Sequence, residues 1–164
     1  MQTDAYAPRE PPTPSLPTRR FVRLLREHAA LFRLQELTVA HDRALSITQL
    51  RCLAEFEGAP ELTAKELTHR LVLSHSRLSH VLESLQGNEM ISRHINPDDR
   101  RIIVVDLSPK GREIVEALEA GLSCRYESAL RTMPREATET AITVLARTLE
   151  KAGPELHPLS SEES

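Results

Sequence analysis

The feature that most constrains the fold of this chain is the spacing of its hydrophobic residues. The spacing has a helical period almost throughout and changes to alternation only once. Leu78, Val81, Leu82 and Leu85 follow the i, i+3, i+4, i+7 pattern that places side chains on one face of a helix. In two later runs the period is two: Ile91, Arg93 and Ile95 alternate with polar neighbours, and Ile103, Val105 and Leu107 share one face, which is typical of strands. We therefore predict a mainly α fold with a small β-hairpin.

Start and stop signals divide the helical part into separate segments. Two starts are capping boxes, in which a hydroxyl residue and a Glu or Gln three positions later each satisfy a free backbone amide. These boxes are Ser46 with Gln49 and Thr63 with Glu66. The predicted order is four helices, the hairpin and two more helices, and the helices begin near residues 18, 46, 63, 74, 108 and 134.

The hairpin turn has the sequence NPDDRR, residues 96–101, which places Arg100 and Arg101 at a solvated tip. An arginine in such a place can enter the minor groove of DNA, where the electrostatic potential is most negative. Asp98 and Asp99 could hold the guanidinium group in position. The alternative is a solvated tip stabilised by local ion pairs, each contributing about 0–1 kcal/mol.

The helix that begins near residue 74 carries polar side chains opposite its apolar face. Arginine can donate two hydrogen bonds to guanine, and serine or histidine can bond base edges or phosphates. Any solvated helix shows a polar face, so the arginine-tipped hairpin directly after it is what favours DNA. The residues that point away from the apolar face are Ser76, Arg77, Ser79, His80 and Glu83, with His75 nearer the margin.

Composition agrees with a small soluble protein whose basic site is local. The chain has 164 residues, a net charge of −3, 3% aromatic residues and no tryptophan, so Leu, Ile, Val and Ala must build the core. Residues 63–112 hold eight Lys and Arg against six Asp and Glu, a net of +2; the remainder holds thirteen against eighteen, a net of −5. This small excess predicts that affinity for DNA depends on a dimer that presents two copies.

Several classes of protein are disfavoured. The N-terminus has no apolar segment of a secretory signal, and no run of about 18 apolar residues would cross a membrane. We expect a cytoplasmic protein with no membrane partner. Cys52 and Cys124 lie far apart and outside metal-binding spacings. The GxSxG, HExxH, P-loop and GxGxxG motifs are absent, so we expect neither an enzyme nor a cofactor.

Three segments together resemble the MarR family of multiple-antibiotic-resistance regulators: SITQLRCLAEF, LTAKELTHRLVLSHSRLSHVLESLQGNEMISR and DDRRIIVVDLSPKGRE, within about residues 45–113. The resemblance implies a winged helix-turn-helix homodimer that binds double-stranded DNA. It implies a domain over residues 18–153, with dimerisation helices at 18–42 and 109–153 and a DNA-binding core at 45–108. The proline-rich residues 1–17 are predicted to be a disordered arm, and residues 154–164 a flexible tail.

Matched by position, the resemblance makes Arg101 the wing arginine, Asp99 the residue that orients it and Arg100 a phosphate contact. His75 and His80 stand where the family more often has Arg, Thr or Ser, which bears on the operator sequence. Ser108 replaces the usual threonine, a neutral change at a helix cap. The candidate DNA-binding residues are Ser74, His75, Ser76, Arg77, Ser79, His80, Arg100 and Arg101, with Asp98 and Asp99 as wing support.

The resemblance also implies a repressor that binds a palindromic operator and responds to an effector. Family members that sense oxidants carry a cysteine in the first helix, which is missing here, and no paired spacing such as HxxxH indicates a metal. An organic effector is therefore the default, and the polar or aromatic residues near the expected cleft are His28, Phe32, His41, Arg51, Cys52 and Phe56.

Two alternatives to a DNA-binding regulator are less favoured. A winged helix that only contacts proteins would leave Arg100 and Arg101 without a role, and steep salt dependence of binding would argue against it. No motif in the sequence supports a catalytic function. The dimer itself predicts that a charged residue at Leu118 or Leu145 weakens DNA binding.

Overall fold

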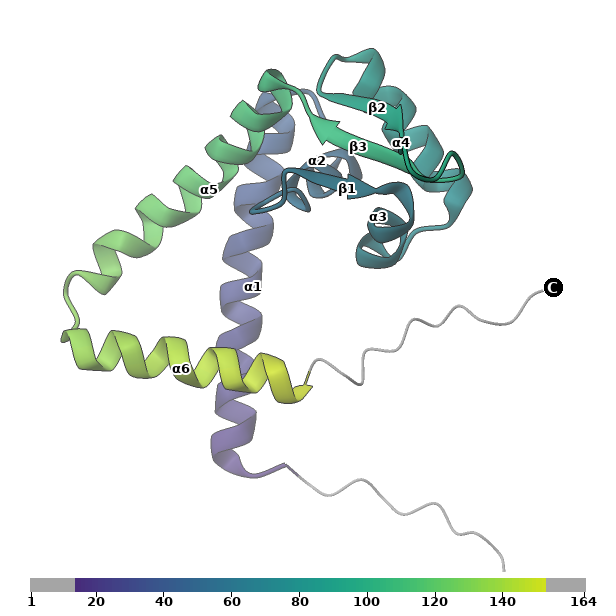
Figure 1. Ribbon diagram of the computed structural model, residues 1–164. Helices are drawn as coiled ribbons and strands as arrows, with labels where there is room; N and C mark the ends of the chain where they lie inside the picture. The colour runs from purple at the N-terminus through teal and green to yellow at the C-terminus, as the bar shows by residue number, and fades with distance from the viewer. Residues whose placement is uncertain (1–13, 153–164) are drawn as a thin grey trace, which may run out of the picture. The chain divides into compact units, whose positions relative to one another are not determined.

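The computed structural model describes residues 14–152 of the chain (Figure 1). The predictions for residues 1–13 and 153–164 lie outside this part. The first helix starts at Leu16, two residues inside the predicted arm, because proline is tolerated in the first turn of a helix. The elements are α1 (Leu16–Asp42), α2 (Ile47–Ala54), β1 (Glu61–Thr63), α3 (Ala64–Leu71), α4 (His75–Gly87), β2 (Ile91–Ile95), β3 (Ile103–Leu107), α5 (Pro109–Leu130) and α6 (Arg135–Ala152).

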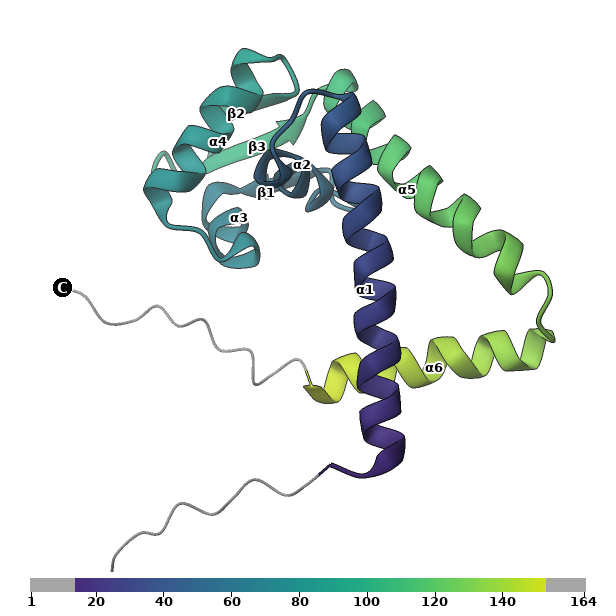
Figure 2. The same cartoon turned by 180° about the vertical axis from the view of Figure 1, so that it is seen from behind.

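The chain divides within α1 into two compact units, and the boundary lies between Leu34 and Gln35. The described residues of the first unit, 14–34, are Pro14, Ser15 and the N-terminal part of α1. The second unit contains the end of α1 and every later element. In both views of this second unit, α5 leads away from the sheet towards α6 (Figures 1 and 2).

The helix starts follow the predicted caps. Ser46 accepts a hydrogen bond from the backbone amide of Gln49, and the Gln49 side chain accepts one from the Ser46 amide, which completes the first capping box. Thr63 and Glu66 complete the second in the same way. These reciprocal bonds satisfy amides that have no partner within the helix. Both capping boxes predicted from the sequence are confirmed.

The sheet has one strand more than predicted. β3 pairs with β2 as the expected antiparallel hairpin, with Arg93 opposite Val105, but it also pairs on its other edge with β1, giving the order β1-β3-β2. The hairpin-only prediction was incomplete. β1 has three residues, too few to display alternation, and its last residue, Thr63, is also the cap of α3.

The core of the second unit lies between the sheet and the helices packed on it. Leu62 of β1 and Val105 of β3 contribute to it beside the apolar face of α4. The predicted face of α4 is confirmed, since Leu78, Leu82 and Leu85 are buried. This core fixes α3, α4 and the hairpin as one body. The other buried residues of the cluster are Val39, Ala40, Leu50, Cys52, Leu53, Phe56, Leu67, Met90, Ile91, Leu107, Ile114, Val115 and Leu118.

Candidate nucleic-acid interface

The turn between α3 and α4 gives the second unit a helix-turn-helix. Hydrogen bonds from the backbone amide and the hydroxyl of Thr63 lower the pKa of the Glu66 carboxyl, which therefore stays ionised at the start of α3. At the other end of α3, Val72 has φ 51° and ψ 47°, in the left-handed region that a β-branched residue rarely adopts. Ser74 then caps α4 by accepting a bond from the Arg77 amide at 3.4 Å.

The predicted polar face of α4 is open to solvent. In the first two turns only Leu78 is buried, because it lies on the face of α4 that packs against the core. His80 lies 3.8 Å from Glu83 across one helical turn, and both side chains are largely exposed. The candidate residues Ser74, His75, Ser76, Arg77, Ser79 and His80 are all exposed.

The wing tip is shaped by hydrogen bonds to backbone amides. The Asn96 side chain accepts bonds from the amides of Asp98 and Asp99 at 2.8 and 3.3 Å. Asp99 in turn accepts a bond from the backbone amide of Arg101 at 2.9 Å. This differs from the expected contact with a guanidinium: within residues 14–152 neither Asp98 nor Asp99 forms an ion pair with a tip arginine.

The turn therefore sets the direction of the Arg100 and Arg101 side chains, and no carboxylate of the tip holds their guanidinium groups. Asp99 orients Arg101 through the main chain, since its bond to the amide fixes the direction in which the residue leaves the turn. Asp98 contributes its own amide to the turn. Both arginines are exposed, so their charges are available to a ligand outside the molecule.

Sequence reasoning missed the polar contacts that fix α4 against its neighbours. Gln49, besides closing its capping box, donates a hydrogen bond to the Ser84 hydroxyl of α4 at 2.7 Å. Arg93 of β2 donates to the Gln86 side chain at 2.5 Å, which ties the hairpin to α4. The capping pattern that identified Gln49 shows one use of its amide group and gives no sign of the second.

The hairpin is also held to the start of α5. Ser108 caps α5 by accepting a bond from the Gly111 amide and donates its hydroxyl to the backbone oxygen of Glu89 at 2.7 Å. Lys110 donates to the backbone oxygen of Asn88 at 2.9 Å. His94 and Asp106 pair at 3.0 Å across the two wing strands. The wing is therefore anchored at its base and shaped at its tip.

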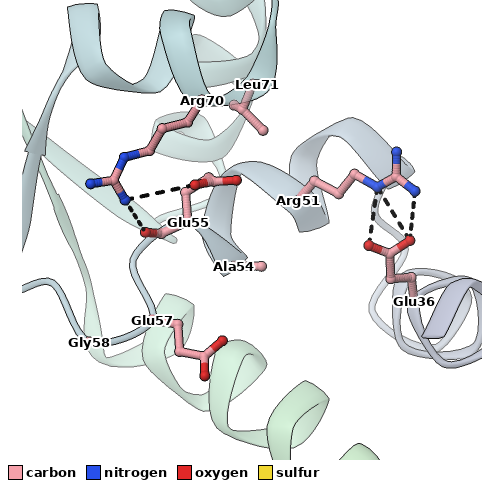
Figure 3. A pocket seen from close by; sticks show the side chains of 8 residues that line it. All are labelled: Glu36, Arg51, Ala54, Glu55, Glu57, Gly58, Arg70 and Leu71. Atoms are coloured by element: carbon pink, nitrogen blue, oxygen red, sulfur yellow. Dashed lines mark hydrogen bonds and ion pairs between the residues drawn. The ribbon is translucent and has the colours of Figure 1, made fainter. Parts of the chain in front are cut away.

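An open cavity of about 680 Å³ lies beside α2 and α3 in the second unit (Figure 3). Arg51 forms a two-pronged ion pair with Glu36, with distances of 2.8 to 3.3 Å, and this hydrogen bonding raises the pKa of Arg51. Arg70 lies 3.8 Å from Glu55. Figure 3 shows the two pairs on different sides of the cavity, whose lining residues are Glu36, Arg51, Ala54, Glu55, Glu57, Gly58, Arg70 and Leu71.

Of the six predicted effector residues, Arg51 alone lines this cavity. Cys52 and Phe56 are buried in the core, and burial raises the pKa of the Cys52 thiol to about 12, which keeps it protonated and unreactive. His41 is exposed at the end of α1. His28 and Phe32 belong to the first unit, where His28 bonds the backbone oxygen of Leu24 at 2.9 Å.

Two other kinds of feature are missing from residues 14–152. No group of three or more His, Cys, Asp and Glu side chains in that range could hold a metal ion. No helix in the same part of the chain is long and apolar enough to cross a membrane.

The architecture of α2 to β3 is that of a winged helix-turn-helix protein, with α3 and α4 as the helix pair and β2–β3 as the wing (Figure 1). Residues 45–103 match the model of the MarR family, so this segment is similar to the winged helix-turn-helix of that family. The match confirms the resemblance found in the sequence.

Comparisons with individual proteins agree. An uncharacterised HTH-type transcriptional regulator of Bacillus subtilis, YsmB, is 24% identical over 127 residues, which is 77% of this chain and 84% of YsmB. A MepR mutant from S. aureus has the same fold, with a TM-score of 0.71 at 17% identity over 80% of this chain and 96% of MepR. Streptococcus pneumoniae FabT, solved in complex with DNA, has a TM-score of 0.66 at 21% identity, covering 82% of this chain and 98% of FabT.

Proposed function

We propose that this protein is a homodimeric transcriptional regulator, and not an enzyme, that binds double-stranded DNA at a palindromic operator and acts as a repressor. The observation that carries the proposal is the combination of an exposed polar face on α4 with two exposed arginines at the tip of the adjoining wing. α4 would read base edges in the major groove, and Arg101 would enter the minor groove. We also propose that it acts in the cytoplasm.

The dimer is supported by apolar surface that a single chain leaves uncovered. α6 has 18 residues and none of them is buried. Ile142 and Leu149 are 60% and 72% exposed, although a helix with one apolar stripe normally buries it against a partner. We assign that partner to a second copy, with α1, α5 and α6 as the dimerisation helices. Two copies would place their recognition helices on half-sites about 34 Å apart.

The experiment that tests this function is selection of bound duplexes from a random-sequence pool at several salt concentrations. We expect enrichment of a palindrome and binding that weakens steeply as salt rises, because Lys and Arg contacts with phosphates release counterions. The competing function, a winged helix for protein contacts, predicts no enrichment from a correctly folded dimer even at low salt.

We further propose that an organic effector releases the DNA by binding in the cavity beside α2 and α3. Arg51 and Arg70 could each exchange a glutamate partner for an anionic group of the effector. The cavity adjoins the C-terminal end of α3, so a bound molecule would act directly on the helix-turn-helix. The other predicted residues, His28, Phe32, His41, Cys52 and Phe56, are not part of this proposal.

Benzoate, a small aromatic carboxylate, is a suitable first probe. We expect millimolar benzoate to weaken operator binding by the wild type. Arg51→Gln should need at least about tenfold more benzoate, because one charge-assisted hydrogen bond contributes roughly 1.5–3 kcal/mol. Arg43→Gln, an exposed arginine outside the cavity, is the matched control. An unchanged benzoate response in Arg51→Gln would show that this cavity is not the effector site.

A further inference from the structure

Residues 14–34, the described part of the first unit, are strongly basic, whereas the rest of the chain is acidic. Residues 14–34 contain five arginines and one glutamate, a net charge of +4. The other residues contain the remaining 16 Lys and Arg and 23 Asp and Glu, a net of −7, which accounts for the total of −3. The positive charge of this helical segment therefore exceeds the +2 of residues 63–112, where the winged helix-turn-helix lies.

Four of the five arginines lie on one face of α1. At about 100° per residue, Arg19, Arg23, Arg26 and Arg33 fall within about 80° of the helix surface. At about 1.5 Å per residue this arginine stripe is roughly 21 Å long. All four side chains are exposed.

The charges of the arginine stripe are largely uncompensated. Arg23 has an ion pair with Glu27 at 3.8 Å, in which both side chains are more than 60% exposed, so the pair contributes little and opens easily. Arg19 donates a hydrogen bond to the backbone oxygen of Pro14. Within residues 14–152, Arg19, Arg26 and Arg33 form no ion pair.

The opposite face of the same helical segment is apolar. Phe21, Leu25 and Phe32 lie about 200–240° around the helix from the centre of the stripe. In the proposed dimer this apolar face is the one that a second copy covers. The arginine stripe then remains towards solvent, and each dimer carries two such stripes.

We propose that the arginine stripe of α1 is a second contact surface for the DNA backbone, in addition to α4 and the wing. The inference rests on the proposed function, which supplies both the dimer and the anionic polymer. These arginines lie one or two helical turns apart, at intervals of about 5–10 Å along an exposed helix, and a line of phosphates can accept hydrogen bonds from several of them. The phosphates belong either to the flanks of the operator or to a second duplex.

DNA is favoured over a lipid surface as the occupant. A helix that lies on a membrane buries its apolar face in the lipid, and here that face is the one assigned to the second copy. A stripe facing away from the apolar side is suited to a rigid polyanion outside the protein. A membrane is the alternative outcome of the test.

The test compares the full-length wild type with the fourfold variant Arg19→Gln, Arg23→Gln, Arg26→Gln and Arg33→Gln. Glutamine has nearly the helix propensity of arginine, so the helix should be retained, and the corresponding four lysine substitutions should restore binding. The matched control is Arg125→Gln, Arg131→Gln, Arg135→Gln and Arg147→Gln, which removes the same charge from exposed positions of α5 and α6 and the turn between them. Circular dichroism and light scattering verify fold and dimer.

Each protein is bound to the selected operator either as the bare site or with 20-base-pair flanks, and a dye-labelled random duplex is then added. We expect the wild type to gain affinity from the flanks or to capture the second duplex. The fourfold glutamine variant should lose that gain, and its salt slope should fall by roughly 3–4 per stripe engaged. If affinity rises with the flanked operator, the stripe contacts the operator flanks. If the random duplex is captured, the stripe contacts a second duplex.

Three results would overturn the inference: no gain in either arm, equal loss in the control variant, or binding to anionic phospholipid vesicles without binding to either DNA. Failure of the proposed function looks different. Suppose that no operator is selected, but that Arg101→Ala still binds duplex DNA and the fourfold variant does not. That result would support the arginine stripe as a DNA contact and would contradict the proposed regulator function.

Discussion

At the scale of single residues, the contact between Gly111 of α5 and the residue before β2 shows how closely the wing packs against α5. A Cβ atom on Gly111 would collide with the backbone oxygen of Met90, which also accepts the amide of Ser108. Backbone atoms at a shared hydrogen bond have little room to move. The glycine is therefore required by close packing, in a place where its φ is that of an ordinary helical residue.

We predict that Gly111→Ala destabilises the fold by about 1–3 kcal/mol, since overpacking of a rigid site costs that much. Gly87→Ala is the control, because a Cβ atom added there would have no neighbour within 4 Å and alanine is the better helix former. Urea unfolding of both variants measures the difference. Equal midpoints would contradict the close approach described here.

At the scale of elements, the two capping boxes and the apolar face of α4 could be predicted from the sequence because each depends on residues three or four positions apart. β1 could not, because a three-residue strand is defined by its partner β3, more than forty positions along the chain. The atom of Arg101 that Asp99 contacts could not be predicted for a related reason. A carboxylate beside an arginine can bond either its side chain or its amide, and only the turn geometry decides.

The bond from Gln49 to Ser84 gives a prediction at this scale, because it joins α2 to the helix proposed to read DNA. Ser84→Ala should weaken operator binding by roughly two- to tenfold, corresponding to a net hydrogen bond of about 0.5–1.5 kcal/mol. The melting temperature should hardly change, since the residue is exposed and alanine favours helices. Ser84→Thr keeps the hydroxyl and should keep the affinity.

Fluorescence anisotropy on the selected operator measures this effect, and Ser92→Ala, an exposed serine on β2, serves as the control. A Ser84→Ala protein that binds like the wild type would show that packing alone positions α4.

At the scale of the whole molecule, the dimer determines whether two recognition helices can act together. The sequence suggested both Leu118 and Leu145 as places to break it, but Leu118 is 7% exposed and belongs to the core of the second unit. A charge there would disturb the fold of the chain itself. Leu145 is 43% exposed on α6 and is the cleaner site.

We predict that Leu145→Glu yields a folded protein that dissociates to monomers and binds the operator at least about tenfold more weakly, because each monomer would hold one half-site. Light scattering gives the mass, and circular dichroism verifies the helices. Glu150→Gln, an exposed position on the same helix, should leave both mass and binding unchanged. An intact dimer in Leu145→Glu would move the interface away from α6.

The central claim, that the winged helix-turn-helix binds DNA with Arg101 at the minor groove, is tested most directly by measuring affinity for the selected operator against salt concentration. The wild type and Arg101→Ala are compared, with Arg125→Ala as the control for charge. We predict that Arg101→Ala loses roughly tenfold to a hundredfold in affinity and about one in salt slope, while Arg125→Ala behaves like the wild type. A wild-type dimer that is folded and binds no duplex preferentially at low salt would contradict the claim.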